Sequence, residues 1–315
     1  MDTTHRALLA RIADLYYNAE LSQAEIGQRL DLSRVKIYRL LKEAREAGVV
    51  RISINWPIER ERALERALIE RFGLSDARVA VHSSLSDDAA MLRQVGRIAA
   101  QVLEETLHDG STLAICLGRA TREAVRAISV GRDRMGMRVA QAVGSIPSSM
   151  QAFDSATIGR ELAAQLGGEV LYLNAPMMAD SPESAEVIRR QPQVAQTLDA
   201  ARNADVALIG IGSVASSTAR LIEAGFIDAA AAETLCMHGA VGDIAGRMFA
   251  ADGSSDFEHN RRVIGIGLDD LRRIPLTLGV ACGSERSEAI RGALRTGALR
   301  ILCTDETTAA GVLNS

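Results

Sequence analysis

Apolar residues recur at helical spacing in three stretches near the beginning of the chain. The second and third stretches, residues 22–30 and 33–44, are joined by a turn of about three residues, which predicts a helix-turn-helix. Ser22 and Glu25 have the spacing of a capping box, and Ser33 can cap the second helix of the pair. A supporting first helix is indicated by apolar positions at Leu8, Leu9, Ile12, Leu15 and Tyr16.

Alternation of polar and apolar residues after Gly48 predicts a short strand over residues 49–54, and hence a winged arrangement. Trp56 and Pro57 then begin a linker. A charged helix is predicted over residues 58–71, with an apolar stripe formed by Ile58, Leu64, Leu68 and Phe72. This helix can pack on its own domain or pair with a second copy of the chain, and we expect a role in self-association as a dimer or tetramer.

From about residue 76 onward, short apolar stretches alternate with longer amphipathic ones. The predicted strands are Arg78–His82, Thr112–Leu117, Arg138–Val143, Glu169–Leu173, Asp205–Ile209, Val263–Ile266, Leu276–Ala281 and Leu299–Cys303. The predicted helices are Asp87–Leu107, Arg122–Ile128, Ile158–Leu166, Gln193–Arg202, Ala219–Ala224 and Glu285–Thr296. This alternation predicts an α/β fold with a mostly parallel sheet covered by helices on both faces. We therefore expect three parts: a DNA-binding domain over 1–56, a linker and oligomerisation helix over 57–75, and an effector-binding domain over 76–315.

The predicted helix over residues 33–44 has two distinct faces. Ile37, Leu40, Leu41 and Ala44 form an apolar stripe, and the opposite face carries polar and cationic residues. Basic side chains stand in the first turn, where the helix dipole disfavours them by up to about 1 kcal/mol, so a polyanionic partner explains them better than helix stability does. The alternative is a solvated basic face. The residues expected to contact double-stranded DNA are Ser22, Gln23, Ser33, Arg34, Val35, Lys36, Tyr38, Arg39 and Lys42.

The charge of the chain is divided unevenly. The formal net charge is -4, but residues 1–56 hold nine Lys or Arg against seven Asp or Glu, a net +2, which leaves -6 for the rest. The acidic bulk would repel DNA and the basic end would not, so the chain is expected to bind DNA through that end. Lysine occurs only at positions 36 and 42, which excludes Schiff-base chemistry beyond residue 56.

Composition and the spacing of particular residues argue against a membrane protein, a secreted protein and a metalloprotein. No apolar run is long enough to cross a membrane, and the beginning of the chain lacks the layout of a signal peptide. The four cysteines, Cys116, Cys236, Cys282 and Cys303, are scattered, as is typical of reduced thiols in a cytoplasmic protein. The histidines show no metal-binding spacing, so no metal and no cofactor are expected.

Glycine and small polar residues repeatedly follow the predicted strands. In an open parallel sheet the loops after the strands converge on one edge, where backbone N–H groups favour anions and small ligands bind. Each loop alone is more simply a turn, but together with nearby charged residues they predict a polar pocket. The residues expected to bind the effector are Gly118, Arg119, Thr121, Gly144, Ser145, Gly212, Asp243, Gly283 and Arg286.

One of these loops, residues 210–215, matches the G-x-G-x-x-A pattern of a dinucleotide site. That fingerprint also needs an acidic residue about 20 positions later, at the end of a second strand. Glu223 and Asp228 lie near that distance but around a predicted helix end, so the match is weak.

Several runs suggest a family. Ser22–Ile26 with Ser33 and Arg34, Ala204–Ser213, Gly239–Ile244, Gly279–Gly283 and Thr304–Glu306 stand in an order that resembles, over nearly the whole chain, the SorC family of bacterial sugar-responsive transcriptional regulators. The resemblance implies an N-terminal helix-turn-helix and a three-layer αβα sugar-binding domain related in fold to sugar-phosphate isomerases and deaminases.

The resemblance also implies roles for particular residues. Effector phosphate or hydroxyl groups would meet Gly118 and Thr121 in one loop and the position of Arg286 in another, while Asp243 would accept hydrogen bonds from hydroxyls. Arg286 stands where the family often has lysine, and Ala120 removes a hydroxyl from the first loop. A sugar, a polyol and a sugar phosphate all therefore remain open as the effector.

The sequence predicts a ligand-responsive DNA-binding regulator of a carbohydrate or polyol catabolic operon, and not an enzyme. The alternative is a sugar-phosphate isomerase or deaminase carrying an added DNA-binding domain, since the fold would permit catalysis. No acid/base pair with catalytic spacing stands out, and Asp243 alone is more simply a hydrogen-bond acceptor.

Overall fold

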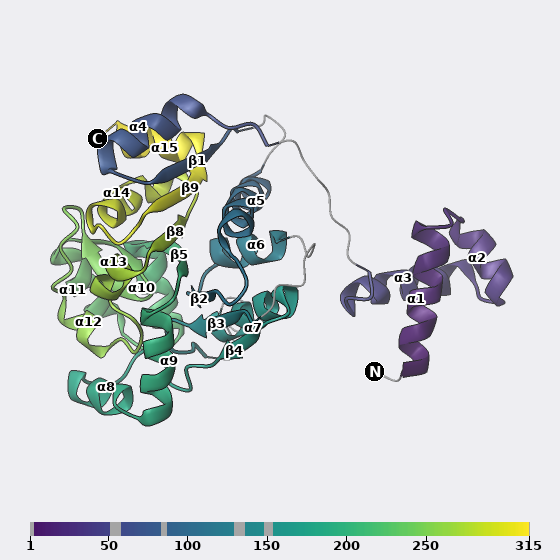
Figure 1. The fold of residues 1–315 in the computed structure, drawn as a ribbon, viewed down its shortest axis with the longest axis horizontal. Helices are drawn as coiled ribbons and strands as arrows, with labels where there is room; N and C mark the ends of the chain where they lie inside the picture. The colour runs from purple at the N-terminus through teal and green to yellow at the C-terminus, as the bar shows by residue number, and fades with distance from the viewer. Residues whose placement is uncertain (1–2, 51–57, 83–86, 129–135, 148–153, 315) are drawn as a thin grey trace. The chain divides into compact units, whose positions relative to one another are not determined.

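The chain divides into two compact units, Met1–Pro57 and Ile58–Ser315, which we describe separately (Figure 1). The computed structural model describes residues 3–50, 58–82, 87–128, 136–147 and 154–314. The predicted wing strand over residues 49–54 lies mostly outside this part of the chain.

Unit 1 is a bundle of three helices, α1 (Thr3–Tyr17), α2 (Gln23–Leu30) and α3 (Arg34–Glu46). The expected capping box is present: the Ser22 hydroxyl accepts from the Glu25 N–H, and the Glu25 carboxylate accepts from the Ser22 N–H at 2.9 Å. Ser33 caps α3 by accepting a hydrogen bond from the Lys36 N–H. The predicted apolar stripes of the three helices meet in one core, formed by Leu9, Ile12, Leu15, Ile26, Ile37, Leu40, Leu41 and Ala44.

Unit 2 is built on a sheet with the strand order β1-β9-β8-β5-β2-β3-β4, and each neighbouring pair along this path is parallel. The strands are β1 (Asp76–Ala80), β2 (Thr112–Ile115), β3 (Arg138–Gln141), β4 (Glu169–Leu171), β5 (Val206–Ser213), β8 (Leu276–Val280) and β9 (Ile301–Asp305). Two further strands, β6 (Ala240–Ile244) and β7 (Arg247–Ala250), form an antiparallel hairpin that pairs with the end of β5.

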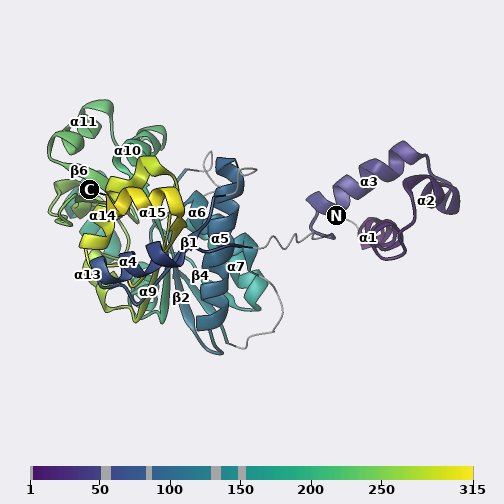
Figure 2. The same ribbon diagram turned by 90° about the horizontal axis from the view of Figure 1, so that it is seen from above.

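Helices cover both faces of the sheet, as the alternation predicted (Figures 1 and 2). One face carries α5 (Asp88–Thr106), α6 (Arg119–Ala127) and α7 (Ser155–Leu166). The helices of the remaining part are α4 (Arg62–Phe72), α8 (Pro182–Arg189), α9 (Pro192–Arg202), α10 (Val214–Glu223), α11 (Ala229–Met237), α12 (Glu258–Arg262), α13 (Leu268–Arg273), α14 (Ser287–Arg295) and α15 (Glu306–Leu313), with a 3-10 turn at Ser284–Arg286.

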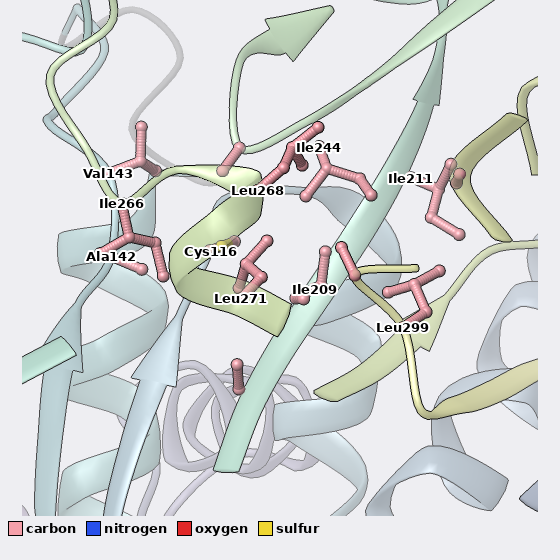
Figure 3. Packing of buried hydrophobic residues seen from close by; sticks show 14 of the residues in the cluster. Cys116, Ala142, Val143, Ile209, Ile211, Ile244, Ile266, Leu268, Leu271 and Leu299 are labelled. Atoms are coloured by element: carbon pink, nitrogen blue, oxygen red, sulfur yellow. The ribbon is translucent and has the colours of Figure 1, made fainter. Parts of the chain in front are cut away.

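Strand residues alternate between two cores because successive side chains point to opposite faces. In β5, Val206 and Leu208 belong to the core under α5, α6 and α7, whereas Ala207 and Ile209 belong to the other core. Figure 3 shows that second core, in which Leu271 of α13 lies beside Ile209 of β5 and Leu268 lies beside Ile244. Both faces of the sheet are therefore buried, which explains why the strands are continuously apolar.

The helix predicted over residues 58–71 is α4, and it packs on its own unit. Leu68 is fully buried in the core, and Leu64, Ile69 and Phe72 lie against the same cluster. Ahead of α4, the segment 59–61 pairs with the end of β1: the Glu61 N–H donates to the Val79 carbonyl and the Val81 N–H donates to the Glu59 carbonyl, both at 2.9 Å. The start of unit 2 is thus hydrogen-bonded to an edge strand of the sheet.

The predicted strand over residues 263–266 is wrong. These residues make only isolated bridges, between Val263 and Met178 and between Gly265 and Val143. Arg247 holds this segment instead, since its guanidinium donates to the carbonyls of Gly265 and Ile266 at 2.9 Å each. An apolar stretch of this length is compatible with a buried strand, but here its backbone partners are irregular and partly side chains.

Candidate functional sites

The helix α3 presents a cationic face to solvent. Val35 is 61% exposed and Tyr38 is 54% exposed, although both are large apolar or aromatic side chains on a helix whose opposite face is buried. The predicted DNA-contacting residues are all exposed except Gln23, which is half-buried. Among the described residues, no carboxylate lies within ion-pair distance of Arg34, Lys36 or Arg39. This face is therefore free to meet phosphates and base edges.

The second candidate site is a cavity of about 930 Å³ at the carboxyl edge of the sheet in unit 2. Its wall is formed by the segments that follow β2, β5, β8 and β9. From β2 the chain continues to its neighbour β3, whereas β5 lies on the other side of β2. This is the point at which the strand order reverses, where open parallel sheets bind ligands. Six of the predicted effector residues line the cavity: Gly118, Arg119, Gly212, Asp243, Gly283 and Arg286.

Asp243 is held in a network between β5, β6 and α10. One carboxylate oxygen accepts from the Ser217 hydroxyl and from the Arg220 guanidinium at 3.2 Å, and the other accepts from the Gly246 N–H at 2.8 Å. Asp243 pairs with Gly212 across the two strands, and a Cβ at Gly212 would lie 2.2 Å from the carboxylate. The glycine is therefore required by the close approach of Asp243, while Arg220 supplies a countercharge for a carboxylate that is only 4% exposed.

A tight hairpin positions this carboxylate. Ala245 and Gly246 connect β6 to β7, and both have positive φ angles, 52° and 79°, as the two central residues of a type I′ turn require. Ala245 lines the cavity, and this backbone conformation costs a non-glycine residue about 1–3 kcal/mol. The buried His259 ring donates from Nε2 to the Gly246 carbonyl at 3.1 Å. Burial lowers the pKa of His259 below its ordinary value of 6.5, so the ring is neutral at neutral pH.

The opposite wall is organised by Asp305, at the end of β9. Its carboxylate caps α15 by accepting from the Thr308 N–H at 2.9 Å, and it also accepts from the Gly283 N–H at 3.1 Å. Gly283 has φ of 108°, a conformation that favours glycine. Arg286 folds back to donate to the Cys282 carbonyl at 2.5 Å and forms an ion pair with Glu285 at 2.8 Å. The cavity wall thus presents carboxylates beside a guanidinium.

The N-terminus of α6 forms the third wall. Gly118, with φ of 140°, stands at the cap position and, as a glycine, has no side chain with which to cap the helix. Thr121 in the first turn is fully buried and does not itself line the cavity; its hydroxyl has no hydrogen-bond partner among the described residues. That hydroxyl lies 3.2 Å from the position of a Cβ on Gly210, between the ends of β2 and β5. An uncapped helix N-terminus beside a spare hydroxyl suits an anion.

Gly144 and Ser145 do not line the cavity. The Gly144 N–H donates to the Ile264 carbonyl at 2.8 Å, and a Cβ at this position would lie 2.2 Å from the carbonyl oxygen of Pro176. Ser145 accepts from the amide of Gln141 at 3.2 Å within a buried network. These two residues shape the backbone after β3.

Sequence reasoning missed Ser217, Arg220 and Asp305. Ser217 and Arg220 are three residues apart on α10, and that spacing places both on one helix face, but the short prediction Ala219–Ala224 began too late to show it. Asp305 caps α15, a helix whose apolar and polar positions do not mark it clearly in the sequence, so the sequence does not reveal this role. The G-x-G-x-x-A pattern does not form a glycine turn, because Gly210 and Gly212 lie within β5.

The thiols near the cavity are poor nucleophiles. Burial raises the pKa of Cys282, which lines the cavity, to about 12, and burial likewise raises the pKa of Cys116 to about 12. Neither forms a thiolate at neutral pH. Within the described residues, no three His, Cys, Asp or Glu side chains are grouped so that they could hold a metal ion. Nor does any helix in that part of the chain have the length and apolar character needed to span a bilayer.

Comparisons with known proteins agree with this division into two units. A sugar-binding domain family, Sugar-bind, matches residues 56–314, and a winged helix-turn-helix DNA-binding family matches residues 1–51. The transcriptional regulator LsrR of Klebsiella pneumoniae is 36% identical over 309 residues, which cover 97% of this chain and 92% of that protein. LsrR of an Enterobacter species is 36% identical over 313 residues, covering 98% of this chain and 94% of that protein.

A solved structure is similar over almost the whole chain. The full-length sorbitol operon regulator SorC from Klebsiella pneumoniae superposes with a TM-score of 0.73 at 27% sequence identity, covering 99% of this chain and all of that one. The predicted fold class, a winged helix-turn-helix followed by an α/β domain with a mostly parallel sheet, is confirmed.

Proposed function

The chain belongs to the family of sugar-binding transcriptional regulators that includes SorC, and we propose that it controls a carbohydrate or polyol catabolic operon through the two sites described above. It is a DNA-binding regulator that responds to a sugar-type ligand. The observation that carries the proposal is that one chain contains both a solvent-facing cationic helix, in unit 1, and a polar cavity of about 930 Å³, in unit 2.

On DNA, we propose that α3 enters the major groove. Arg34, Val35 and Arg39 would meet base edges, because guanidinium groups suit guanine and a valine methyl suits thymine. Ser33, Tyr38 and Lys42 would hold phosphates, as would Ser22, Gln23 and Lys36 around the start of the two helices. The exposure of Val35 and Tyr38 supports this assignment, since neither side chain gains from contact with water.

In unit 2, we propose that the cavity takes a sugar, a polyol or a sugar phosphate. The carboxylates of Asp243, Asp305 and Glu285 can accept hydrogen bonds from hydroxyl groups. The uncapped start of α6, the Thr121 hydroxyl and Arg119 favour an anionic group at the other end of the ligand. Of the three classes, a phosphorylated sugar uses both sets of groups.

We propose that the cavity binds its ligand without turning it over. The carboxylate of Asp243 is already engaged by Ser217, Arg220 and Gly246, which suits a fixed hydrogen-bond acceptor better than a general base. The relatives named above are described as transcriptional regulators. Formation of a product from any sugar phosphate, followed by mass spectrometry with the purified protein, would overturn this part.

The division into 1–56, 57–75 and 76–315, with the middle part aiding self-association, is also a proposal. Since α4 buries Leu68 within its own unit, only its outer residues, such as Arg66 and Glu70, remain for a second copy. A symmetric dimer or tetramer would present two or more copies of α3 to a palindromic operator. Light scattering of the full chain distinguishes these states from a monomer.

The test of the whole proposal combines two measurements. Thermal unfolding with a panel of sugars, polyols and their phosphates identifies ligands, because a ligand at 100 times its dissociation constant raises the free energy of unfolding by about 2.7 kcal/mol. Fluorescence anisotropy with an operator selected from random duplexes then measures DNA affinity with and without that ligand. We expect a change equivalent to about 1–3 kcal/mol. DNA binding that no panel member changes would leave a constitutive DNA binder and would reject the sensing role.

A further inference from the structure

The side-chain amino groups of this chain are confined to one helix. The sequence has 36 Lys and Arg residues, of which only Lys36 and Lys42 are lysine, and both lie in α3. The guanidinium of arginine stays protonated and is not a nucleophile under mild conditions. A reagent that acylates amines therefore meets side-chain targets only on the helix that we propose reads DNA.

Both lysines can be modified without disturbing the core. The buried face of α3 consists of Ile37, Leu40, Leu41 and Ala44, and Lys36 and Lys42 are exposed. The Lys42 side chain is 60% exposed, and its Nζ lies 3.7 Å from Glu46, a solvent-screened pair that contributes little to stability. An acyl group on either Nζ would extend into solvent.

The change in charge is large relative to the charge of the unit. Unit 1 has a net charge of +2 from nine cationic and seven anionic residues, and the rest of the chain has -6. Acylation of both lysines removes both units of net positive charge. A neutral DNA-reading unit attached to an acidic body loses the attraction to the phosphate backbone on which association depends.

We propose that Lys36 and Lys42 form an acylation site at which an acyl phosphate turns off DNA binding; this rests on the proposed DNA-binding function. The neutral amine attacks the acyl carbonyl carbon, a C–N amide bond forms and the C–O bond to phosphate breaks. Inorganic phosphate leaves with the electron pair, and the proton of the amine goes to water. No oxidation or reduction is involved.

The test uses the full-length protein and acetyl phosphate. Peptide mass spectrometry locates the acetyl groups, and anisotropy with a fluorescent mixed-sequence duplex is measured over a series of salt concentrations. We expect acetylation at both lysines and a loss of affinity of about tenfold for each. The slope of affinity against salt should also fall by about 0.9 for each phosphate that the protein no longer neutralises. Duplex bound before treatment should protect both lysines.

The double variant Lys36→Arg with Lys42→Arg is the matched control, because it keeps both charges but has no side-chain amine. Its affinity after treatment, divided by its affinity before, should stay near one. An equal loss in this variant, unmodified lysines, or an unchanged isotherm after full acetylation would each overturn the inference. A chain that binds no duplex even before treatment would instead overturn the DNA-binding function itself, and an unchanged melting curve shows that acetylation leaves the fold intact.

Discussion

The carboxylate of Glu65 accepts a hydrogen bond of 2.6 Å from the guanidinium of Arg60, and the same oxygen accepts from the Val79 N–H of β1 at 3.0 Å. The Glu65 side chain is only 5% exposed. Its second oxygen pairs with Arg62 at 3.2 Å. This one carboxylate therefore fastens the segment before α4 and the helix itself to the edge of the sheet.

Replacement of Glu65 by alanine should destabilise unit 2 by about 3 kcal/mol, because it leaves the half-buried Arg60 and the Val79 N–H without their acceptor. Denaturant unfolding measures the change. The matched control is Glu70→Ala, on an exposed position of the same helix, which should cost less than about 0.5 kcal/mol. Equal losses of unfolding free energy in the two variants would show that the buried ion pair contributes no more to stability than an exposed side chain does.

A Gly212→Ala substitution should disturb the effector cavity while DNA binding by unit 1 persists. The new Cβ would lie 2.2 Å from Asp243 and 2.4 Å from the Ser217 hydroxyl, so the carboxylate must move, at a cost of about 1–3 kcal/mol. The expected result is a weakened ligand response in the anisotropy assay. Gly267→Ala is the control, since its Cβ would meet its nearest neighbour at an ordinary 3.5 Å. A full ligand response in Gly212→Ala would remove Asp243 from the site.

Thr121→Val should weaken binding of an anionic effector by about 1 kcal/mol or more, because it removes a hydroxyl that a phosphate would use. The free protein should be as stable as before, or more stable, since the hydroxyl is buried without a partner among the described residues. Thr304→Val removes another such buried hydroxyl, from β9, and should leave affinity unchanged. Neither threonine lines the cavity, but Thr121 directly follows the lining residues Gly118, Arg119 and Ala120 in the first turn of α6. Calorimetric titration with the identified ligand measures both variants.

Acid should destabilise unit 2 through His259. Because burial lowers its pKa in the folded state, the unfolded chain takes up the proton first. The stabilising contribution is complete above pH 6.5 and is lost as the pH falls through the folded pKa, by at most about 1.4 kcal/mol per pH unit. The free energy of unfolding of His259→Gln should change less with pH over this range than that of the parent protein. His238→Gln, at an exposed position, should show the same pH dependence as the parent protein.

Arg39→Ala should reduce operator affinity by about 1–3 kcal/mol if the guanidinium makes a bidentate base contact. Arg11→Ala is the control, since that side chain is 64% exposed on α1 of the same unit. Anisotropy with selected operator and with mixed-sequence duplex separates base reading from phosphate contact. An equal loss of affinity for both duplexes would show that Arg39 contacts the phosphate backbone of the DNA and not the bases.

Local rules were sufficient for much of this architecture. The capping box at Ser22 and Glu25 depends on residues three apart, and the buried parallel strands are visible as short apolar runs, so both could be predicted. The hairpin β6–β7 could not, because its turn uses Ala245 at a position where asparagine, aspartate or glycine is the usual signal. The turn is also held by a hydrogen bond from the ring of His259, in α12, to the Gly246 carbonyl, which the local pattern of the hairpin does not reveal.

The same distinction applies to the cavity. Glycines after strands pointed to the correct edge of the sheet, but the partners of Asp243 come from α10 and those of Gly283 from α15. Contacts between elements distant in sequence leave no periodic signal. Gly144 has the same local pattern as Gly118, yet the carbonyl of Pro176 blocks it. Only the three-dimensional arrangement separates a ligand-facing glycine from a packing one.

Hydrogen bonds between segment 59–61 and β1 also bring the first residues of unit 2 close to the effector cavity. The bond between Val81 and Glu59 lies one residue before His82, which borders the cavity. Glu59 is the second residue of unit 2, so the start of this unit is hydrogen-bonded to the residue next to a cavity-lining side chain. Along this path the cavity and the start of unit 2 are separated by a single peptide unit and one hydrogen bond, rather than by the width of the sheet.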